Sequence, residues 1–78
     1  MQKIILKKDR NKIKIVLVKK HKVKDILGIQ NSKSEILFDI KKFINYVNNG
    51  IYISKNAFDF IYKILVNELI NEKIIIVK

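Results

Sequence analysis

Two apolar runs on either side of a short polar segment open the chain and predict a β-hairpin over residues 3–20. Polar and apolar residues alternate from Lys12 to Ile15 before the run Val16-Leu17-Val18, which is a strand pattern rich in β-branched side chains. Asp9-Arg10-Asn11 supplies a polar turn between the runs. One face of the second strand would carry Ile13, Ile15 and Leu17, and the other Lys12, Lys14, Val16, Val18 and Lys20. The hairpin is therefore expected to have one apolar side and one mixed basic side.

The segment 21–31 has no clear period. Val23, Ile26 and Leu27 fit a helical turn, whereas Gly28 and Gln30-Asn31 fit a strand that ends in a loop. Of these two alternatives, we expect a short helix or an irregular turn.

A helix is predicted from about residue 33 to residue 48. Ser32 and Glu35 have the spacing of a capping box, and Asn49-Gly50 is typical of a helix end. The apolar residues between them recur at helical spacing: Ile36, Ile40, Phe43, Ile44 and Val47.

A brief extended segment, Ile51-Tyr52-Ile53, precedes a second predicted helix that begins after Ser54 and runs to about Asn71. The apolar stripe of this helix is expected to consist of Phe58, Ile61, Tyr62, Leu65 and Leu69, widened by Ala57, Phe60 and Ile64. So broad a stripe suggests burial on more than one side. The β-branched run from Lys73 to Lys78 predicts a final strand.

These elements predict an α+β fold in which a small antiparallel or mixed sheet, built from the N-terminal β-hairpin and the C-terminal strand, is packed by two helices. With 78 residues, the chain can bury one hydrophobic core and not two, so residues 1–78 are expected to form a single domain.

Composition agrees with a folded protein, since 49% of the residues are hydrophobic and 31% are charged. Lys7, Lys8, Asp9 and Arg10 interrupt the opening apolar run, and no window approaches the roughly 18 apolar residues of a membrane span. We therefore expect a cytoplasmic protein with no membrane partner, located in the host cytoplasm if the chain is viral.

Positive charge is concentrated in the first third of the chain. The formal net charge is +10, yet residues 1–24 hold ten basic side chains against Asp9 alone. An A/T-rich coding bias, visible in 17 Ile, 16 Lys and 8 Asn, would enrich lysine everywhere. Such a bias explains the abundance of lysine and leaves its segregation unexplained.

Catalytic and metal-ligating patterns are weak. The chain has no cysteine, one histidine (His21) and two glycines, which excludes thiolate chemistry and a glycine-rich phosphate loop. Two of its three serines, Ser32 and Ser54, already serve as expected helix caps. We expect no enzymatic activity, no catalytic residues, no metal site and no cofactor.

The basic segment is the strongest functional signal, because lysines along a two-stranded ribbon can follow a phosphate backbone. We predict a small non-enzymatic protein that binds nucleic acid, RNA or DNA, through Lys7, Lys8, Arg10, Lys12, Lys14, Lys19, Lys20, Lys22 and Lys24. All aromatic residues lie beyond residue 37, which favours phosphate contacts over base recognition. The same lysines could instead form a solvated face that keeps a β-rich protein soluble.

A second hypothesis is a protein-interaction module, such as a phage or mobile-element inhibitor that docks on an acidic surface of a larger complex. Self-association into a homodimer is a third, through the predicted final strand or the broad stripe of the second helix.

Overall fold

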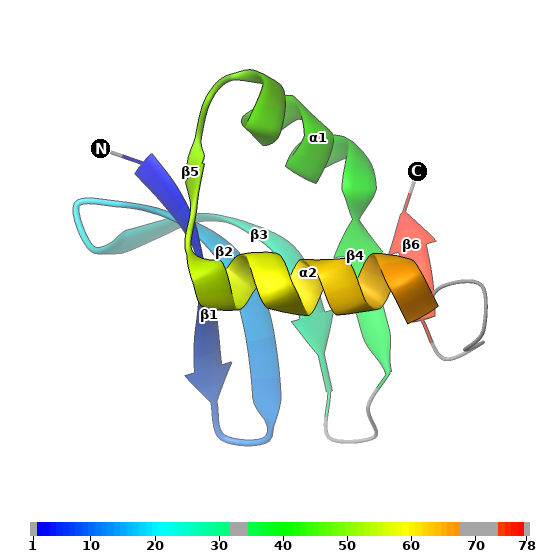
Figure 1. The fold of residues 1–78 in the computed structure, drawn as a ribbon. Helices are drawn as coiled ribbons and strands as arrows, with labels where there is room; N and C mark the ends of the chain where they lie inside the picture. Colours follow the sequence, from blue (N-terminus) through cyan, green and yellow to red (C-terminus); the bar gives the residue numbers. More distant parts are fainter. Residues whose placement is uncertain (1, 32–34, 68–73, 78) are drawn as a thin grey trace.

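A computed structural model describes residues 2–31, 35–67 and 74–77, which form a six-stranded mixed sheet and two helices. The order of the strands in the sheet is β5-β1-β2-β3-β4-β6. The elements are β1 (Gln2–Asp9), β2 (Lys12–Lys19), β3 (Lys22–Gln30), β4 (Ile36–Asp39), α1 (Ile40–Asn48), β5 (Tyr52–Ile53), α2 (Lys55–Asn67) and β6 (Ile74–Val77). α2 crosses one face of the sheet, and α1 lies beside one end of it (Figure 1). The α+β class is confirmed, and the predicted make-up of the sheet is matched only in part.

The N-terminal hairpin is confirmed. β1 and β2 pair antiparallel from Gln2 opposite Lys19 to Asp9 opposite Lys12, so only Arg10 and Asn11 remain for the turn. Arg10 has a positive φ of 55°, which a non-glycine residue adopts at some cost. The polar segment is therefore a two-residue hairpin turn.

The prediction for residues 21–31 was wrong, because Lys22–Gln30 form β3. This strand pairs with β2 along its length and with β4 from Gly28 to Gln30. Gly28 lies where a Cβ atom would come within 3.0 Å of the Leu37 carbonyl oxygen and 3.1 Å of Phe38 Cδ1. The glycine that suggested a turn instead permits close packing of β4.

The predicted helix 33–48 begins later than expected. Residues 36–39 form β4, and α1 starts at Ile40 with Asp39 as its N-cap, whose Oδ1 accepts a hydrogen bond from the Lys42 amide at 3.1 Å. Ser32 lies outside the described residues, and Glu35 Oε1 accepts a hydrogen bond from the Asn31 side chain instead of capping the helix. Pairing with β3 and β6 overrides the local helical spacing of this segment.

The predicted stop of the first helix is confirmed. Gly50 has φ 78° and donates its amide hydrogen to the Val47 carbonyl, while Ile51 donates to the Tyr46 carbonyl. These two bonds define a Schellman motif. The motif turns the chain from α1 into β5 at the far edge of the sheet (Figure 1).

α2 has the predicted start, because Ser54 Oγ accepts a hydrogen bond from the Ala57 amide. Within the broad predicted stripe, Ala57, Ile61 and Ile64 are buried as expected, whereas Phe58 and Tyr62 are exposed. The described helix ends at Asn67, so the predicted extension to Asn71 and the side chain of Leu69 lie outside the described residues. The predicted final strand is confirmed as β6, which runs parallel to β4.

The core lies between the helices and one face of the sheet. Its buried residues are Ile4, Ile15, Leu17, Leu27, Phe38, Ala57, Ile61 and Ile64. On the opposite face of β2, which was predicted to be a mixed basic side, Val16 and Val18 are only 1% and 6% exposed. Among the residues that the structure describes, neither helix has the length and apolarity needed to cross a bilayer.

Candidate functional site

The predicted nucleic-acid-binding residues fall into two groups at opposite ends of β2. Lys7, Lys8, Arg10, Lys12 and Lys14 surround the β1–β2 turn, and Lys19, Lys20, Lys22 and Lys24 surround the β2–β3 turn. β2 is eight residues long, so at about 3.3 Å per residue the two ends lie roughly 23 Å apart. The basic segment is thus continuous in sequence and divided in space.

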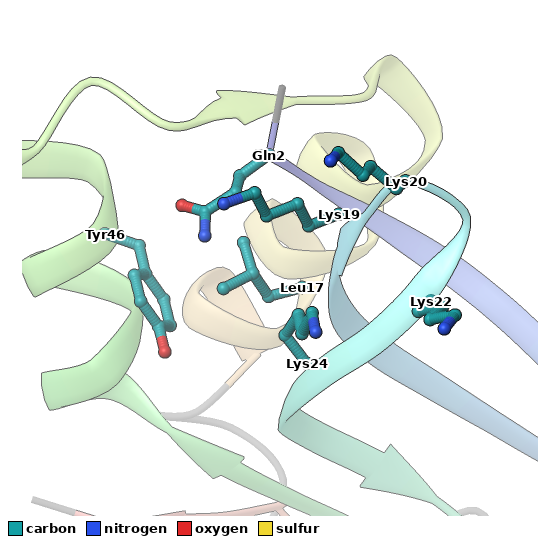
Figure 2. A pocket seen from close by; sticks show the side chains of 7 residues that line it. All are labelled: Gln2, Leu17, Lys19, Lys20, Lys22, Lys24 and Tyr46. Carbon is teal, nitrogen blue, oxygen red and sulfur yellow. The ribbon is translucent and has the colours of Figure 1, made fainter.

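The β2–β3 end forms a pocket of about 570 Å³ on the side of the sheet that faces α1 (Figure 2). Its lining residues are Gln2, Leu17, Lys19, Lys20, Lys22, Lys24 and Tyr46. Figure 2 shows Tyr46 on the α1 side, the lysines on the hairpin side and Leu17 between them. All four lysines predicted at this end of β2 therefore line one cavity.

Sheet register positions these lysines. Gln2, Lys19 and Lys22 form one row across three adjacent strands, since Lys19 pairs with Gln2 on β1 and with Lys22 on β3. Leu17 pairs with Asp25 and Val18 with Val23, so Lys24 is the extra residue of a β-bulge. Bulges commonly redirect a side chain at the rim of a sheet.

The turn between β2 and β3 is strained. Lys20 and His21 both have positive φ angles, 52° and 66°, which is the pattern of a type I′ hairpin turn. Asn-Gly is the favoured pair at such positions, because L-residues with a long side chain are disfavoured there. The chain therefore holds Lys20 at the pocket in a conformation that lysine rarely adopts.

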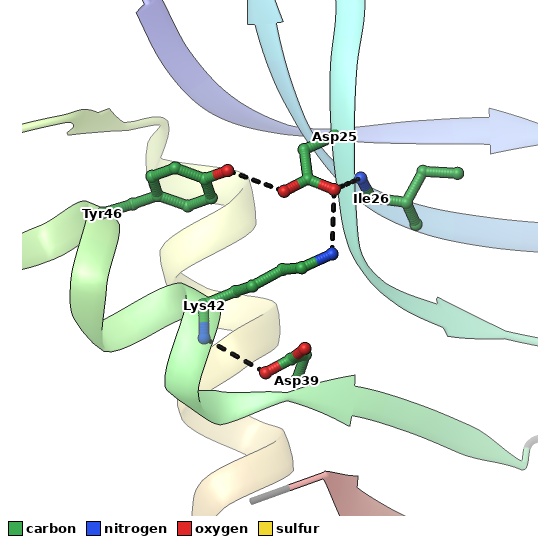
Figure 3. A network of polar contacts seen from close by, with 5 residues as sticks. All are labelled: Asp25, Ile26, Asp39, Lys42 and Tyr46. Carbon is green, nitrogen blue, oxygen red and sulfur yellow. Dashed lines mark hydrogen bonds and ion pairs between the residues drawn. The ribbon is translucent and has the colours of Figure 1, made fainter.

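A polar network that joins α1 to β3 holds Tyr46 at the pocket (Figure 3). Its hydroxyl donates a hydrogen bond to Asp25 Oδ2 at 2.6 Å, and Lys42 Nζ donates to Asp25 Oδ1 at 2.9 Å. The Ile26 amide also donates to Oδ1 at 2.9 Å. One carboxylate thus fixes both the tyrosine ring and the angle of α1 against the sheet.

The network changes the protonation equilibria of its members. The hydrogen bond from Tyr46, followed by those from Lys42 and Ile26, lowers the pKa of Asp25 against the opposing effect of burial. The same carboxylate raises the pKa of Tyr46 and the pKa of Lys42, since it stabilises their protonated forms. At neutral pH the carboxylate is charged and the tyrosine is protonated, which is the state that the hydrogen bonds require.

Positive charge in the pocket is not balanced locally. Lys19 and Lys22 lie directly opposite each other on neighbouring strands. Two like charges in such a cross-strand pair repel each other and destabilise the sheet. None of the described residues that line the pocket is acidic, and both carboxylate oxygens of nearby Asp25 already accept hydrogen bonds. A bound anion would relieve the repulsion, so the pocket is suited to a negatively charged ligand.

The β1–β2 end is charged in a different way. Lys7 and Lys14 are cross-strand partners, and Lys14 Nζ lies 3.8 Å from Asp9 Oδ2. Arg10 and Lys12 line a hollow of about 450 Å³ together with Asp9 and Asn11. Because Asp9 lies among these cations, the positive charge of this end is more compensated than that of the β2–β3 end.

Sequence reasoning missed three contributors to the pocket, namely Gln2, Leu17 and Tyr46. The hydrophobic pattern did predict that Leu17 lies on the apolar face. Tyr46 had a usable signal, because it follows Phe43 by one helical turn and both pack against the core. Nothing local indicated that α1 would place this tyrosine beside lysines more than 20 positions earlier in the chain.

Comparison of the chain with protein-family models, with curated proteins and with solved structures finds no match. Within residues 2–31, 35–67 and 74–77, no three His, Cys, Asp or Glu side chains group in a way that could hold a metal ion. Function must therefore be inferred from the chemistry of the site itself.

Proposed function

We propose that this chain is a small, non-enzymatic nucleic-acid-binding protein that holds phosphate groups with the lysines of the β2–β3 end. The observation that carries the proposal is the convergence of Lys19, Lys20, Lys22 and Lys24 on one cavity, which has no acidic residue among the described residues that line it. Ammonium groups gathered in this way replace the counterions of a phosphate chain, which is the main source of affinity in such complexes. We propose the cytoplasm as the setting, since nucleic acid is present there.

The strained Lys20-His21 turn supports the same proposal. Lysines are paired across strands at both ends of β2, but at the β1–β2 end Asp9 Oδ2 lies 3.8 Å from Lys14 Nζ. At the β2–β3 end two consecutive residues, Lys20 and His21, also have positive φ. Both features cost stability, and an anion bound at the β2–β3 end would offset that cost. Lys7, Lys8, Arg10, Lys12 and Lys14 would then form a second, weaker contact region farther along the same nucleic acid.

Salt dependence tests the proposal directly. Binding of a fluorescent random-sequence oligonucleotide should weaken as salt rises, with a slope of log K against log salt of about −3 for four phosphate contacts to a single strand. The variant K19Q/K20Q/K22Q should flatten that slope by about 2. A matched variant with the same loss of charge on exposed helical lysines, K41Q/K55Q/K63Q, should keep most of the slope. Affinity that is absent, or that is independent of salt, would overturn the proposal.

One observation favours the second candidate, a protein-interaction module. Phe58, Tyr62 and Val66 are 54%, 61% and 48% exposed on one side of α2, and apolar side chains exposed together often mark a protein contact. The lysines would then face an acidic surface of the partner. A stoichiometric protein that co-purifies after nuclease treatment, and that is lost in Tyr62→Ser, would favour this candidate over nucleic-acid binding.

A further inference from the structure

The pocket at the β2–β3 end has an apolar wall in addition to its lysines. Leu17 and the ring of Tyr46 lie on the side toward the core, and the ammonium-bearing side chains lie on the other (Figure 2). Contacts to a phosphate backbone alone can be made from a flat surface and need no cavity. A hollow of about 570 Å³ is within the size range of sites that enclose a small ligand group.

Tyr46 is held in place before any ligand arrives. Its hydroxyl is bonded to Asp25 at 2.6 Å, while its ring is half-buried and lines the pocket. Because the hydroxyl is already used, the ring is the part of Tyr46 that a ligand would contact. A ring fixed in this way loses little conformational freedom on binding, which favours affinity.

Gln2 adds a group that can recognise a polar edge. It occupies the same row as Lys19 at the rim of the pocket, and its side-chain amide has both hydrogen-bond donors and an acceptor. An aromatic ring, an amide and several ammonium groups in one cavity match three features of a nucleotide: the flat face of its base, the polar edge of that base and the phosphates.

We propose, building on the nucleic-acid-binding function above, that this pocket takes one unpaired base of a single strand. The base packs on the ring of Tyr46, and the flanking phosphates lie on Lys19, Lys20, Lys22 and Lys24. Bases in a duplex are stacked and paired, so a duplex can offer only its phosphates to the lysines. The protein therefore prefers single-stranded to double-stranded nucleic acid.

Four probes of equal phosphate number test this inference by fluorescence anisotropy: a single-stranded oligonucleotide, the same sequence with base-free sugars throughout, a duplex, and the corresponding amount of free nucleotide. We expect the single strand to bind about tenfold or more tightly than the base-free strand or the duplex. We expect free nucleotide to bind far more weakly, because it cannot occupy several lysines along a backbone.

Variants of Tyr46 supply the matched comparison. Tyr46→Leu should reduce affinity for the single strand by about 5- to 150-fold, the range for loss of one base stack, with the salt slope unchanged. Tyr46→Phe keeps the ring and should retain most of the affinity. Gln2→Ala removes a pocket side chain that is remote from the Asp25 network. A loss of single-strand affinity in this variant would therefore come from the pocket and not from a loosened α1.

The possible binding results distinguish a failure of the single-strand inference from a failure of the proposed phosphate binding on which it rests. Equal, salt-dependent binding of all three polymeric probes, with Tyr46→Leu unchanged, would overturn the inference and leave phosphate binding standing. No binding of any polymer would overturn both. Free nucleotide that binds as tightly as the strand would also overturn the inference, since the site would then be one for a small molecule.

Discussion

Asp25 combines three hydrogen bonds on one side chain, and its protonation should control how firmly α1 is attached to the sheet. The folded state lowers the pKa of Asp25 below its ordinary value of 3.8. The stabilisation that results is fully present above that value and is lost as pH falls through the lowered pKa. Acid should therefore loosen α1 and, with it, the tyrosine wall of the pocket.

We expect the variant Asp25→Asn to be less stable than the natural chain at pH 7 and to show a smaller loss of stability between pH 4 and pH 2. Urea unfolding at several pH values measures both quantities. Asp59→Asn, which removes a carboxylate from the exposed side of α2, should leave the pH profile close to that of the natural chain. Parallel profiles for all three proteins would contradict this role for Asp25.

The strained residues of the β2–β3 turn allow a second prediction. Replacing Lys20-His21 by Asn-Gly should stabilise the fold by about 1–2 kcal/mol, because both new residues accept positive φ more readily. In a chain of this size, that gain raises the melting temperature by at least about 4 °C. The same variant should bind oligonucleotide more weakly through the loss of Lys20. Calorimetry and anisotropy on one sample test this trade-off, which an unchanged melting temperature would contradict.

At the scale of elements, α2 shows that helical spacing alone does not determine which side chains are buried. Ile61 is 2% exposed and its neighbour Tyr62 is 61% exposed, although both belong to the apolar stripe that the sequence predicted. We expect Ile61→Ala to lower the free energy of unfolding by about 2–5 kcal/mol. Tyr62→Ala should cost less than about 1 kcal/mol, as substitutions on exposed surfaces usually do. Urea titration of the two variants checks the difference, and similar losses would mean that Tyr62 is also packed.

Elements with local signals were predictable from the sequence, and those that depend on distant partners were not. The β1–β2 hairpin, the Ser54 cap and the Gly50 stop each rest on residues a few positions apart. β4 was predicted as helix because Ile36 and Ile40 have helical spacing, yet its strand form depends on pairing with β3 and β6. Periodicity contains no information about such pairing.

At the scale of the whole molecule, the basic segment illustrates the same limit. Its nine predicted contact residues are close together in sequence, but they lie toward the two opposite ends of β2. The third strand places Lys19 to Lys24 at one end of β2 and leaves Lys7 to Lys14 at the other. Charge counting located the segment, but only the strand topology shows which lysines lie close together.

The order of strands also bears on how the molecule folds. β1 to β4 are neighbours in both sequence and sheet, whereas the chain reaches β5 at one edge through α1 and returns through α2 to β6 at the other edge. Contacts between near neighbours lose less chain entropy when they form. We infer that the four-stranded antiparallel part assembles first and that the two parallel edges close afterwards.

Kinetic measurements can test this order. Val16→Ala, in the buried centre of β2, should mainly slow refolding, and Ile64→Ala, on the buried side of α2, should mainly speed unfolding. Equal effects of the two variants on the refolding rate would contradict this order of folding. If this order and the proposed binding mode both hold, the lysine side of the pocket is built before Tyr46 arrives on α1. An early intermediate would then attract phosphate without yet distinguishing a single strand from a duplex.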